Sequence, residues 1–116
     1  DKEDIDSIAS NFSSNDYLDL CDKLDLLNYC TIVKYSKCLV GVESLSGHIA
    51  GALNKSAIII GSGTTNKYQW EPLGNYINYI TEDIGCSPCY VGSGCKTMDC
   101  INRINPNSIY EMSLKL

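Results

Sequence analysis

Two short apolar runs on either side of a small-residue segment constrain the fold of this chain more than any other feature. Residues 38–42 read Cys-Leu-Val-Gly-Val and residues 56–60 read Ser-Ala-Ile-Ile-Ile. Continuous apolar runs of this length are typical of strands buried on both faces, as in parallel sheets. Residues 47–53 between them are small and compatible with a helix, which the serines of the turn 43–46 can cap. The pattern predicts a βαβ unit, and therefore an α/β fold with a parallel sheet flanked by helices.

Other segments predict further helices and one more strand. Residues 75–80 form a third, shorter apolar stretch, and Asn105 followed by Pro106 is typical of a helix start. Residues 2–12 and 25–36 carry apolar side chains near helical spacing, and we expect the second helix to turn its apolar stripe toward the sheet. That stripe consists of Leu24, Leu27, Ile32 and Tyr35. At 116 residues, the chain is long enough for one such domain and too short for two.

Charge and hydropathy exclude two broad classes of protein. The net charge is −5, and residues 1–25 carry eight acidic against two basic side chains, which leaves the rest of the chain near +1. No basic cluster is present, so the electrostatic footprint of a nucleic-acid-binding protein is missing. The longest aliphatic run, 57–60, is far shorter than the ~20 residues that cross a bilayer. The first residues are acidic, so we expect no secretory signal there. Because residue 1 is not Met, we expect that it is not the natural start of the polypeptide.

The seven cysteines fall into two groups. Three are scattered among apolar residues, where cysteine is usually a small core residue: Cys21, Cys30 and Cys38. The other four lie within fifteen positions, in a segment (85–100) whose Gly, Ser and Pro content predicts an irregular loop: Cys86, Cys89, Cys95 and Cys100. An odd total leaves no complete pairing, which favours a reducing, intracellular compartment.

The four clustered cysteines have the composition of a metal site. Four thiolates can close a tetrahedral shell around zinc or iron, and the spacing of Cys86 and Cys89 is the usual first half of such a site. Cys95 and Cys100 are separated by four residues, whereas the usual second half has two. From the residues alone, a metal site, disulfides and free structural thiols all stay open.

Polar segments follow both strands of the βαβ unit, at the edge where open parallel sheets bind ligands. Glu43 directly follows the first strand, where its carboxylate can accept hydrogen bonds from sugar hydroxyls or tie down the loop. The residues after it form the turn and the helix N-terminus, where the dipole and free N–H groups favour an anion: Ser44, Ser46, Gly47 and His48. A lone histidine is more often structural than catalytic, but its position at a helix N-terminus favours the anion-binding role.

The segment after the second strand begins like a dinucleotide-binding loop. It contains Gly61, Ser62, Gly63 and Thr64, but Asn66 stands where the third glycine of that fingerprint would be. Glycines let backbone N–H groups approach a phosphate, and hydroxyls add donors. Phosphate contact and an ordinary loop therefore both fit this segment.

Taken in order, these segments resemble glycosyltransferase family 9, the heptosyltransferases. In that family a strand runs into an acidic residue, a hydroxyl residue, a glycine, two further residues, a histidine and an Ala-rich helix, as residues 38–53 nearly do. Residues 56–64 are similar to the next strand and its Gly-containing loop, and Trp70, Pro72 and Gly74 match the turn after it. The cysteine segment, then Ile104 and Pro106 before a helix, are similar to the ending of many members. The resemblance covers about residues 24–114.

The resemblance implies a GT-B fold of twin Rossmann-like lobes, in which the C-terminal lobe binds the nucleotide sugar and the N-terminal lobe holds the acceptor and the catalytic base. Residues 1–116 are similar to the C-terminal lobe, with its first strand missing. By position, Glu43 would contact the donor sugar, the 44–48 segment would hold the diphosphate, and residues 61–64 would border the same cleft. Two residues differ from the family pattern, because Glu43 stands where Asp is usual and Leu45 stands where Gly is usual. Both differences are also compatible with an inactive relative of the family.

The function implied is donor binding in an enzyme that transfers a heptose or hexose from a nucleotide-diphosphate sugar to a surface glycan or protein acceptor. We expect no turnover from this chain alone, because the base lies in the missing lobe. We also expect a bacterial, cytoplasmic protein, peripheral to the inner membrane face at most, with homo-oligomerisation left open. Some relatives hold iron with a cysteine cluster, which adds weight to the metal site. The alternative is a metal-stabilised structural or interaction module.

Overall fold

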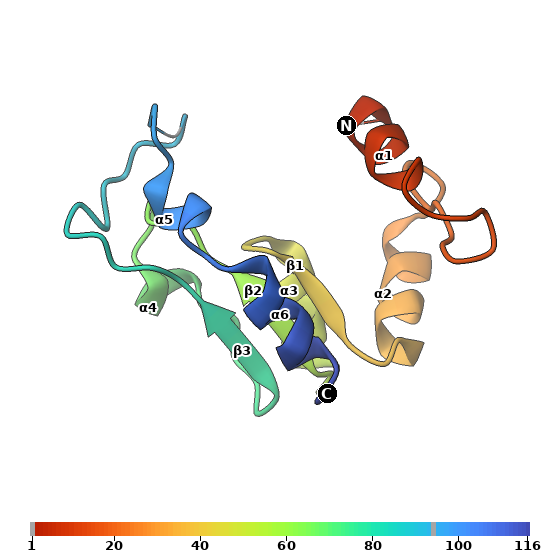
Figure 1. Ribbon diagram of the computed structural model, residues 1–116. Helices are drawn as coiled ribbons and strands as arrows, with labels where there is room; N and C mark the ends of the chain where they lie inside the picture. The colour runs from red at the N-terminus through yellow and green to blue at the C-terminus, as the bar shows by residue number, and fades with distance from the viewer. Residues whose placement is uncertain (1, 94) are drawn as a thin grey trace.

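A three-stranded parallel sheet forms the centre of the computed structural model, which describes residues 2–93 and 95–116 (Figure 1). Its strands are β1 (Leu39–Val42), β2 (Ala57–Ile60) and β3 (Ile77–Ile80), in the order β1-β2-β3. Helix α3 (Leu45–Ala52) connects β1 to β2 and packs against all three strands. The predicted parallel α/β fold and its βαβ unit are confirmed.

The middle strand is buried because its apolar run has a partner on each face. Ala57 and Ile59 have no exposed surface and pack with Val33 and Ala50 in the main core cluster, on the α3 side of the sheet. Ile58 points to the opposite face and is also fully buried. Figure 1 draws α6 (Pro106–Ser113) across that face. Helices therefore flank the sheet on both sides, as continuous apolar strands require.

Helix α2 (Leu26–Tyr35) is confirmed, but its predicted apolar face is wrong. The Asp25 side chain caps it by accepting the Asn28 N–H at 2.7 Å. Val33 is the buried residue of this helix, and α2 packs against α3 rather than on the sheet. Two members of the predicted stripe, Leu27 and Tyr35, are both 78% exposed. Tyr29 lies four residues before Val33, so both side chains are on the same face of the helix and pack against the same core. Leu27 and Ile32 of the predicted stripe are five residues apart, which places their side chains about 140° apart around the helix.

The remaining helices are short, and several begin or end away from their predicted positions. Helix α3 starts at Leu45 instead of residue 47, because Ser44 is its cap. Helix α1 (Lys2–Ala9) ends three residues early. The one-turn helices α4 (Lys67–Trp70) and α5 (Asp99–Asn102) were not expected. Within the described residues, none of the helices has both the length and the apolar character needed to span a membrane.

Candidate functional site

The polar segments singled out in the sequence meet at one edge of the sheet. The Glu43 N–H donates to the Ile60 carbonyl at 3.0 Å, and the Gly61 N–H donates to the Ile80 carbonyl at 2.8 Å. All three strands therefore end at the same level, with the 43–48 turn and the 61–66 loop side by side above them. This is the carboxyl edge, where parallel α/β sheets bind ligands.

The carboxylate of Glu43 ties the three strand ends together. Thr65 Oγ1 donates to one of its oxygens at 2.7 Å, and the Tyr79 hydroxyl donates to the other at 2.5 Å. Burial, followed by the hydrogen bond and the charge of Glu43, raises the pKa of Tyr79. Of the two roles considered for Glu43, these contacts are those of a residue that ties down the loop. Contact with a donor sugar stays a prediction.

The two glycines of the 61–64 loop are buried against side chains of the protein itself. A Cβ on Gly61 would lie 2.2 Å from the Tyr79 hydroxyl oxygen, and one on Gly63 would lie 2.3 Å from Ser87 Oγ. The carbonyl of Gly63 accepts the Cys89 N–H at 3.1 Å, which holds the loop to the cysteine segment. The glycines therefore make room for neighbouring side chains, and the phosphate contact predicted for them stays a prediction.

Two hydroxyls inside the same loop bond to each other. The Ser62 and Thr64 hydroxyl oxygens are 2.6 Å apart, and both residues are half-buried. The carbonyl of Thr64 accepts the Tyr90 N–H at 2.8 Å, a second tie to the cysteine segment. The loop is thus fixed from both sides before any ligand arrives.

The start of α3 is more open. Ser44 caps the helix in an extended conformation and is exposed, with its hydroxyl oxygen 2.7 Å from that of Ser46. His48 lies in the first turn and is exposed as well. Gly47 is the exception, since it is buried and a Cβ there would lie 2.6 Å from Pro72 Cγ. Hydroxyls and an imidazole are thus available to solvent beside the positive end of the helix.

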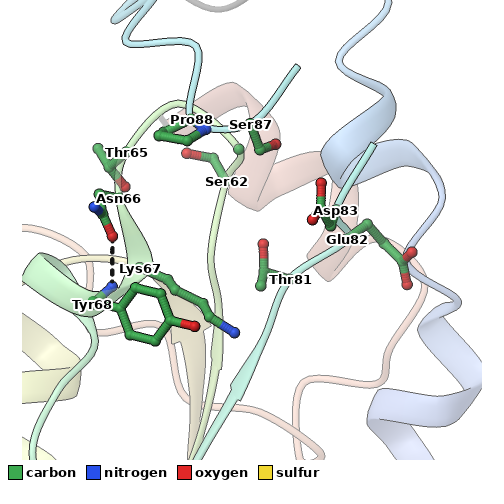
Figure 2. Close-up of a pocket in the computed structure, with 11 residues that line it drawn as sticks. Ser62, Thr65, Asn66, Lys67, Tyr68, Thr81, Glu82, Asp83, Ser87 and Pro88 are labelled. Atoms are coloured by element: carbon green, nitrogen blue, oxygen red, sulfur yellow. Dashed lines mark hydrogen bonds between the residues drawn. The ribbon is translucent and has the colours of Figure 1, made fainter. Parts of the chain in front are cut away.

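A pocket of about 350 Å³ opens beside the 61–66 loop, between the ends of β2 and β3 (Figure 2). Figure 2 shows Lys67 and Tyr68 on one wall, with Glu82 and Asp83 across from them. The complete lining is Ser62, Gly63, Thr65, Asn66, Lys67, Tyr68, Thr81, Glu82, Asp83, Ser87 and Pro88. Only Ser62 and Gly63 were predicted. The polar residues directly after the third strand were the missed signal, because the rule that ligands bind at strand ends applies to β3 as well.

Residues 1–98 match the sequence model of Glycosyltransferase family 9 (heptosyltransferase). The chain belongs to glycosyltransferase family 9. No curated protein and no solved structure matches it. The matched residues include the sheet, α3 and the pocket. They also include the acidic residues 1–25, most of which lie before the 24–114 region that resembles the family.

The four clustered cysteines of this family 9 chain differ in their surroundings. Cys86 and Cys95 are exposed, Cys89 is half-buried and Cys100 is buried. In residues 2–93 and 95–116, no three His, Cys, Asp or Glu side chains gather closely enough to hold a metal ion. These residues as placed do not form a metal site, so zinc or iron binding stays a prediction that rests on sequence spacing.

The other three cysteines are less buried than expected of core residues. Cys21, Cys30 and Cys38 are all half-buried, and none belongs to the main core cluster. All seven thiols of the family 9 chain are free.

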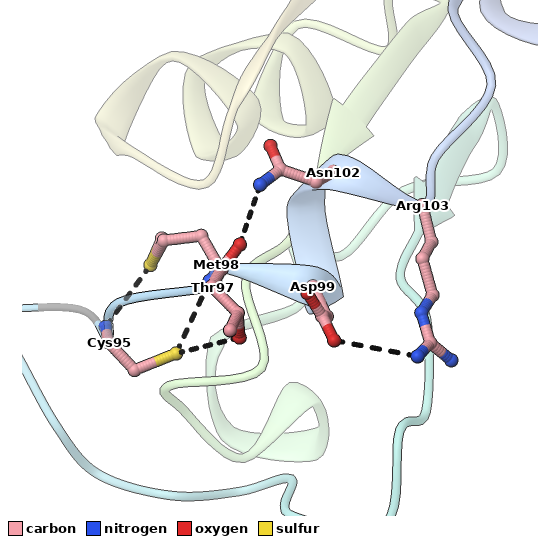
Figure 3. A network of polar contacts seen from close by, with 6 residues as sticks. All are labelled: Cys95, Thr97, Met98, Asp99, Asn102 and Arg103. Atoms are coloured by element: carbon pink, nitrogen blue, oxygen red, sulfur yellow. Dashed lines mark hydrogen bonds and ion pairs between the residues drawn. The ribbon is translucent and has the colours of Figure 1, made fainter.

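Cys95 has the most distinctive environment of the clustered thiols (Figure 3). Its sulfur accepts the Met98 N–H at 3.3 Å and lies 3.7 Å from the Thr97 hydroxyl oxygen. These donors, the Met98 N–H first, lower the pKa of the Cys95 thiol because they stabilise its thiolate. In the family 9 chain this residue is therefore an exposed thiol that ionises more readily than usual.

Proposed function

We propose that the chain is the donor-binding domain of a glycosyltransferase that passes a heptose or hexose from a nucleotide-diphosphate sugar to a surface glycan or protein acceptor. One observation carries the proposal beyond the family: the first turn of α3 leaves Ser44, Ser46 and His48 accessible at the carboxyl edge of the sheet. Ligands of open α/β sheets bind at that edge.

The proposed task of this turn is to hold the departing diphosphate. When the sugar is transferred, negative charge develops on the nucleoside diphosphate. Free N–H groups and the positive end of the α3 dipole stabilise that charge, and the Ser44 and Ser46 hydroxyls and the His48 imidazole add donors. The Ser44 and Ser46 hydroxyls bond to each other at the helix N-terminus, so these two groups are positioned before the reaction and little reorganisation opposes the stabilisation.

The acceptor and the catalytic base are assigned to a second lobe. We therefore propose that this polypeptide binds donor without turning it over, and that the complete enzyme acts in the cytoplasm of a bacterium. An assay of sugar transfer by the isolated chain tests this division, since any transfer would contradict it.

Calorimetric titration with nucleoside diphosphates tests the binding site itself. We expect His48→Ala and the double variant Ser44→Ala/Ser46→Ala each to weaken the affinity for the nucleotide by about 10-fold or more, as expected for lost hydrogen bonds to a charged group. Ser108→Ala, which removes an exposed hydroxyl from the first turn of α6, is the matched control and should leave the affinity unchanged. Equal affinities for all variants would sink the proposal.

The second candidate function is a metal-stabilised structural or interaction module. The spacing of Cys86, Cys89, Cys95 and Cys100 favours it. Elemental analysis of purified protein discriminates between the candidates, because a stoichiometric zinc or iron content supports the cluster and its absence removes this alternative. An inactive relative, suggested by Leu45, would bind no nucleotide in the titration above.

A further inference from the structure

An open apolar groove lies at the end of the molecule formed by α1 and α2, and Figure 1 shows α4 at the opposite end. Its volume is about 530 Å³. Ile5, Ile8 and Phe12 form one wall, and residues 17–24 and α2 supply the others. Ile8, Phe12 and Leu18 are 63%, 57% and 77% exposed, so solvent reaches the apolar lining. Contiguous apolar surface of this kind marks an interaction site in a folded protein.

The spacing of the apolar residues explains why two helix faces meet in this groove. Ile5, Ile8 and Phe12 are three and four residues apart, so their side chains lie in one row along α1 and the turn that follows it. On α2, Ile32 follows Tyr29 by three residues, and both line the groove from the other side. Two helices thus direct apolar side chains into one groove without filling it.

The surroundings of the groove are strongly acidic. Residues 3–25, which supply most of its lining, carry seven acidic side chains and one lysine, a net charge of −6. That lysine, Lys23, is paired with Asp19 at 3.1 Å. Lys34 on α2 lies two residues after Ile32, about 200° around the helix from it, and therefore on the far side from the groove. The region around the groove accordingly keeps its negative charge.

Two exposed carboxylates stand directly beside lining residues. Asp6 follows Ile5 on α1, and Asp22 follows Cys21 in the segment between the two helices. Because both carboxylates are exposed, they can pair with a cation of a partner at the rim without the cost of burying a charge. Acidic groups around an apolar groove attract a basic partner and repel an acidic one.

This charge selects among the occupants of an apolar groove. A second copy of the chain brings its own net charge of −6 over residues 3–25 against the first, and like charges oppose that contact. A nucleic acid or an anionic lipid surface is repelled for the same reason. The lining comes from α1, α2 and the segment between them, so it offers side chains instead of a sheet edge. The apolar face of an amphipathic helix fits such a groove.

We propose that this groove binds the apolar face of a basic amphipathic helix that belongs to a partner protein. Aliphatic side chains of the partner, three and four residues apart, fill the space between Ile8, Leu18 and Ile32. Lysine or arginine side chains beside them pair with Asp6 and Asp22 at the rim. The groove shares no residue with the 43–48 turn or the 61–66 loop, so this proposal is independent of the proposed function.

Fluorescence anisotropy with a labelled peptide tests the groove. The probe is LKKLLKLLKKLLKL, a helix with one leucine face and one lysine face, and its control peptide has glutamate in place of every lysine. We expect the lysine peptide to bind the chain about 10-fold more tightly than the glutamate peptide, or better. Leu18→Ser and the double variant Asp6→Asn/Asp22→Asn should each weaken the lysine peptide by about 5-fold or more.

Matched substitutions outside the groove are the controls. Leu73→Ser makes the same change as Leu18→Ser at a position that is 89% exposed. The double variant Glu82→Gln/Glu111→Gln removes the same amount of charge from two other exposed carboxylates. Both controls should change the affinity for the lysine peptide by less than about 2-fold. Thermal melting followed by circular dichroism establishes that each variant is folded.

Four results overturn the proposal. If neither peptide binds, or both bind equally, the groove has no preference for a basic helix. If either groove variant binds like its control, the apolar lining and the acidic rim do not act together. If ultracentrifugation shows a dimer of the unaltered chain that Leu18→Ser dissociates, the groove holds a second copy. If the chain binds phosphatidylcholine vesicles and Leu18→Ser abolishes that binding, the groove contacts a lipid surface.

Discussion

The 43–48 turn and the 61–66 loop lie at the same edge of the sheet, have similar compositions and are used differently. The turn leaves Ser44 and His48 open to solvent at a helix N-terminus. In the loop, side chains of the protein occupy the space beside the glycines: Tyr79 lies beside Gly61, and Ser87 lies beside Gly63. The glycines do not make this difference, because Gly47 in the turn is buried against Pro72 just as the loop glycines are buried against their neighbours. The turn is open because its polar side chains are exposed, which the composition of the two segments does not indicate.

Substituting a glycine of the packed loop should have the largest effect. In Gly61→Ala, the new methyl group overlaps the half-buried Tyr79 side chain, and we expect a loss of about 3 kcal/mol in the free energy of unfolding. Urea denaturation measures it. Gly92→Ala is the control, because a Cβ there meets no atom within 4 Å, and it should stay within about 0.5 kcal/mol of the unaltered protein. Equal stability of the two variants would show that the loop is as open as the turn.

Removing the charge that joins the two segments should have the next largest effect. Glu43→Gln replaces one acceptor oxygen with an NH₂ group, which then faces the hydroxyl of Thr65 or Tyr79. We expect a loss of about 1–2 kcal/mol in unfolding free energy, reduced by partial exposure of the site. Urea midpoints measure the loss, with Glu111→Gln on the exposed side of α6 as control. A change no greater than that of the control contradicts the tying role.

Alkaline pH should weaken the packed loop selectively. Because the folded protein raises the pKa of Tyr79 above its ordinary 10.0, the unfolded chain loses this proton first as the pH rises. The contribution of Tyr79 is complete below about pH 10 and is lost above it. The stability difference between the unaltered protein and Tyr79→Phe should therefore narrow above pH 10, whereas the difference for the exposed Tyr76→Phe should stay constant. If the stability difference for Tyr79→Phe stays constant above pH 10, the folded protein does not raise the pKa of Tyr79.

The smallest expected effect is a difference in the rate at which two cysteines of the 85–100 segment are alkylated. Cys100 is buried beside Gly63, whereas Cys95 is exposed and its pKa is lowered. Iodoacetamide at neutral pH should modify Cys95 a few times faster than the exposed Cys86 and leave Cys100 intact, because the thiolate is the reactive form. Mass spectrometry of digested protein measures all three rates. Equal labelling of Cys95 and Cys86 would contradict the effect of the Met98 N–H.

The parts of the fold that were predictable depend on local information. The apolar runs at 39–42 and 57–60 indicated buried strands, the serines before α3 indicated a cap, and Pro106 marked the start of α6. Each of these signals lies within a few residues of the element that it predicts. The family resemblance also depended on their order, and the match over residues 1–98 confirms it.

The parts that were missed depend on partners far away in the chain. The partner of Glu43 on β3 is 36 residues further along, and no local pattern indicates that pairing. Gly63 likewise packs against Ser87 and Cys100, which approach it from the cysteine segment and from α5. The walls of the pocket come from two strand ends, so a motif within either segment describes only half of it. Helix α4 was missed for another reason, since a single turn is too short for helical periodicity to appear.

The two hydrogen bonds that Glu43 accepts limit how a ligand can bind its carboxylate. Both oxygens already accept protein hydroxyls, from Thr65 and Tyr79. A sugar hydroxyl that competes for either position exchanges one hydrogen bond for another, so the site gains only the difference between the two. Such an exchange adds little affinity, but it frees Thr65 or Tyr79 to rotate. A ligand that bound Glu43 in this way would therefore loosen the sheet edge.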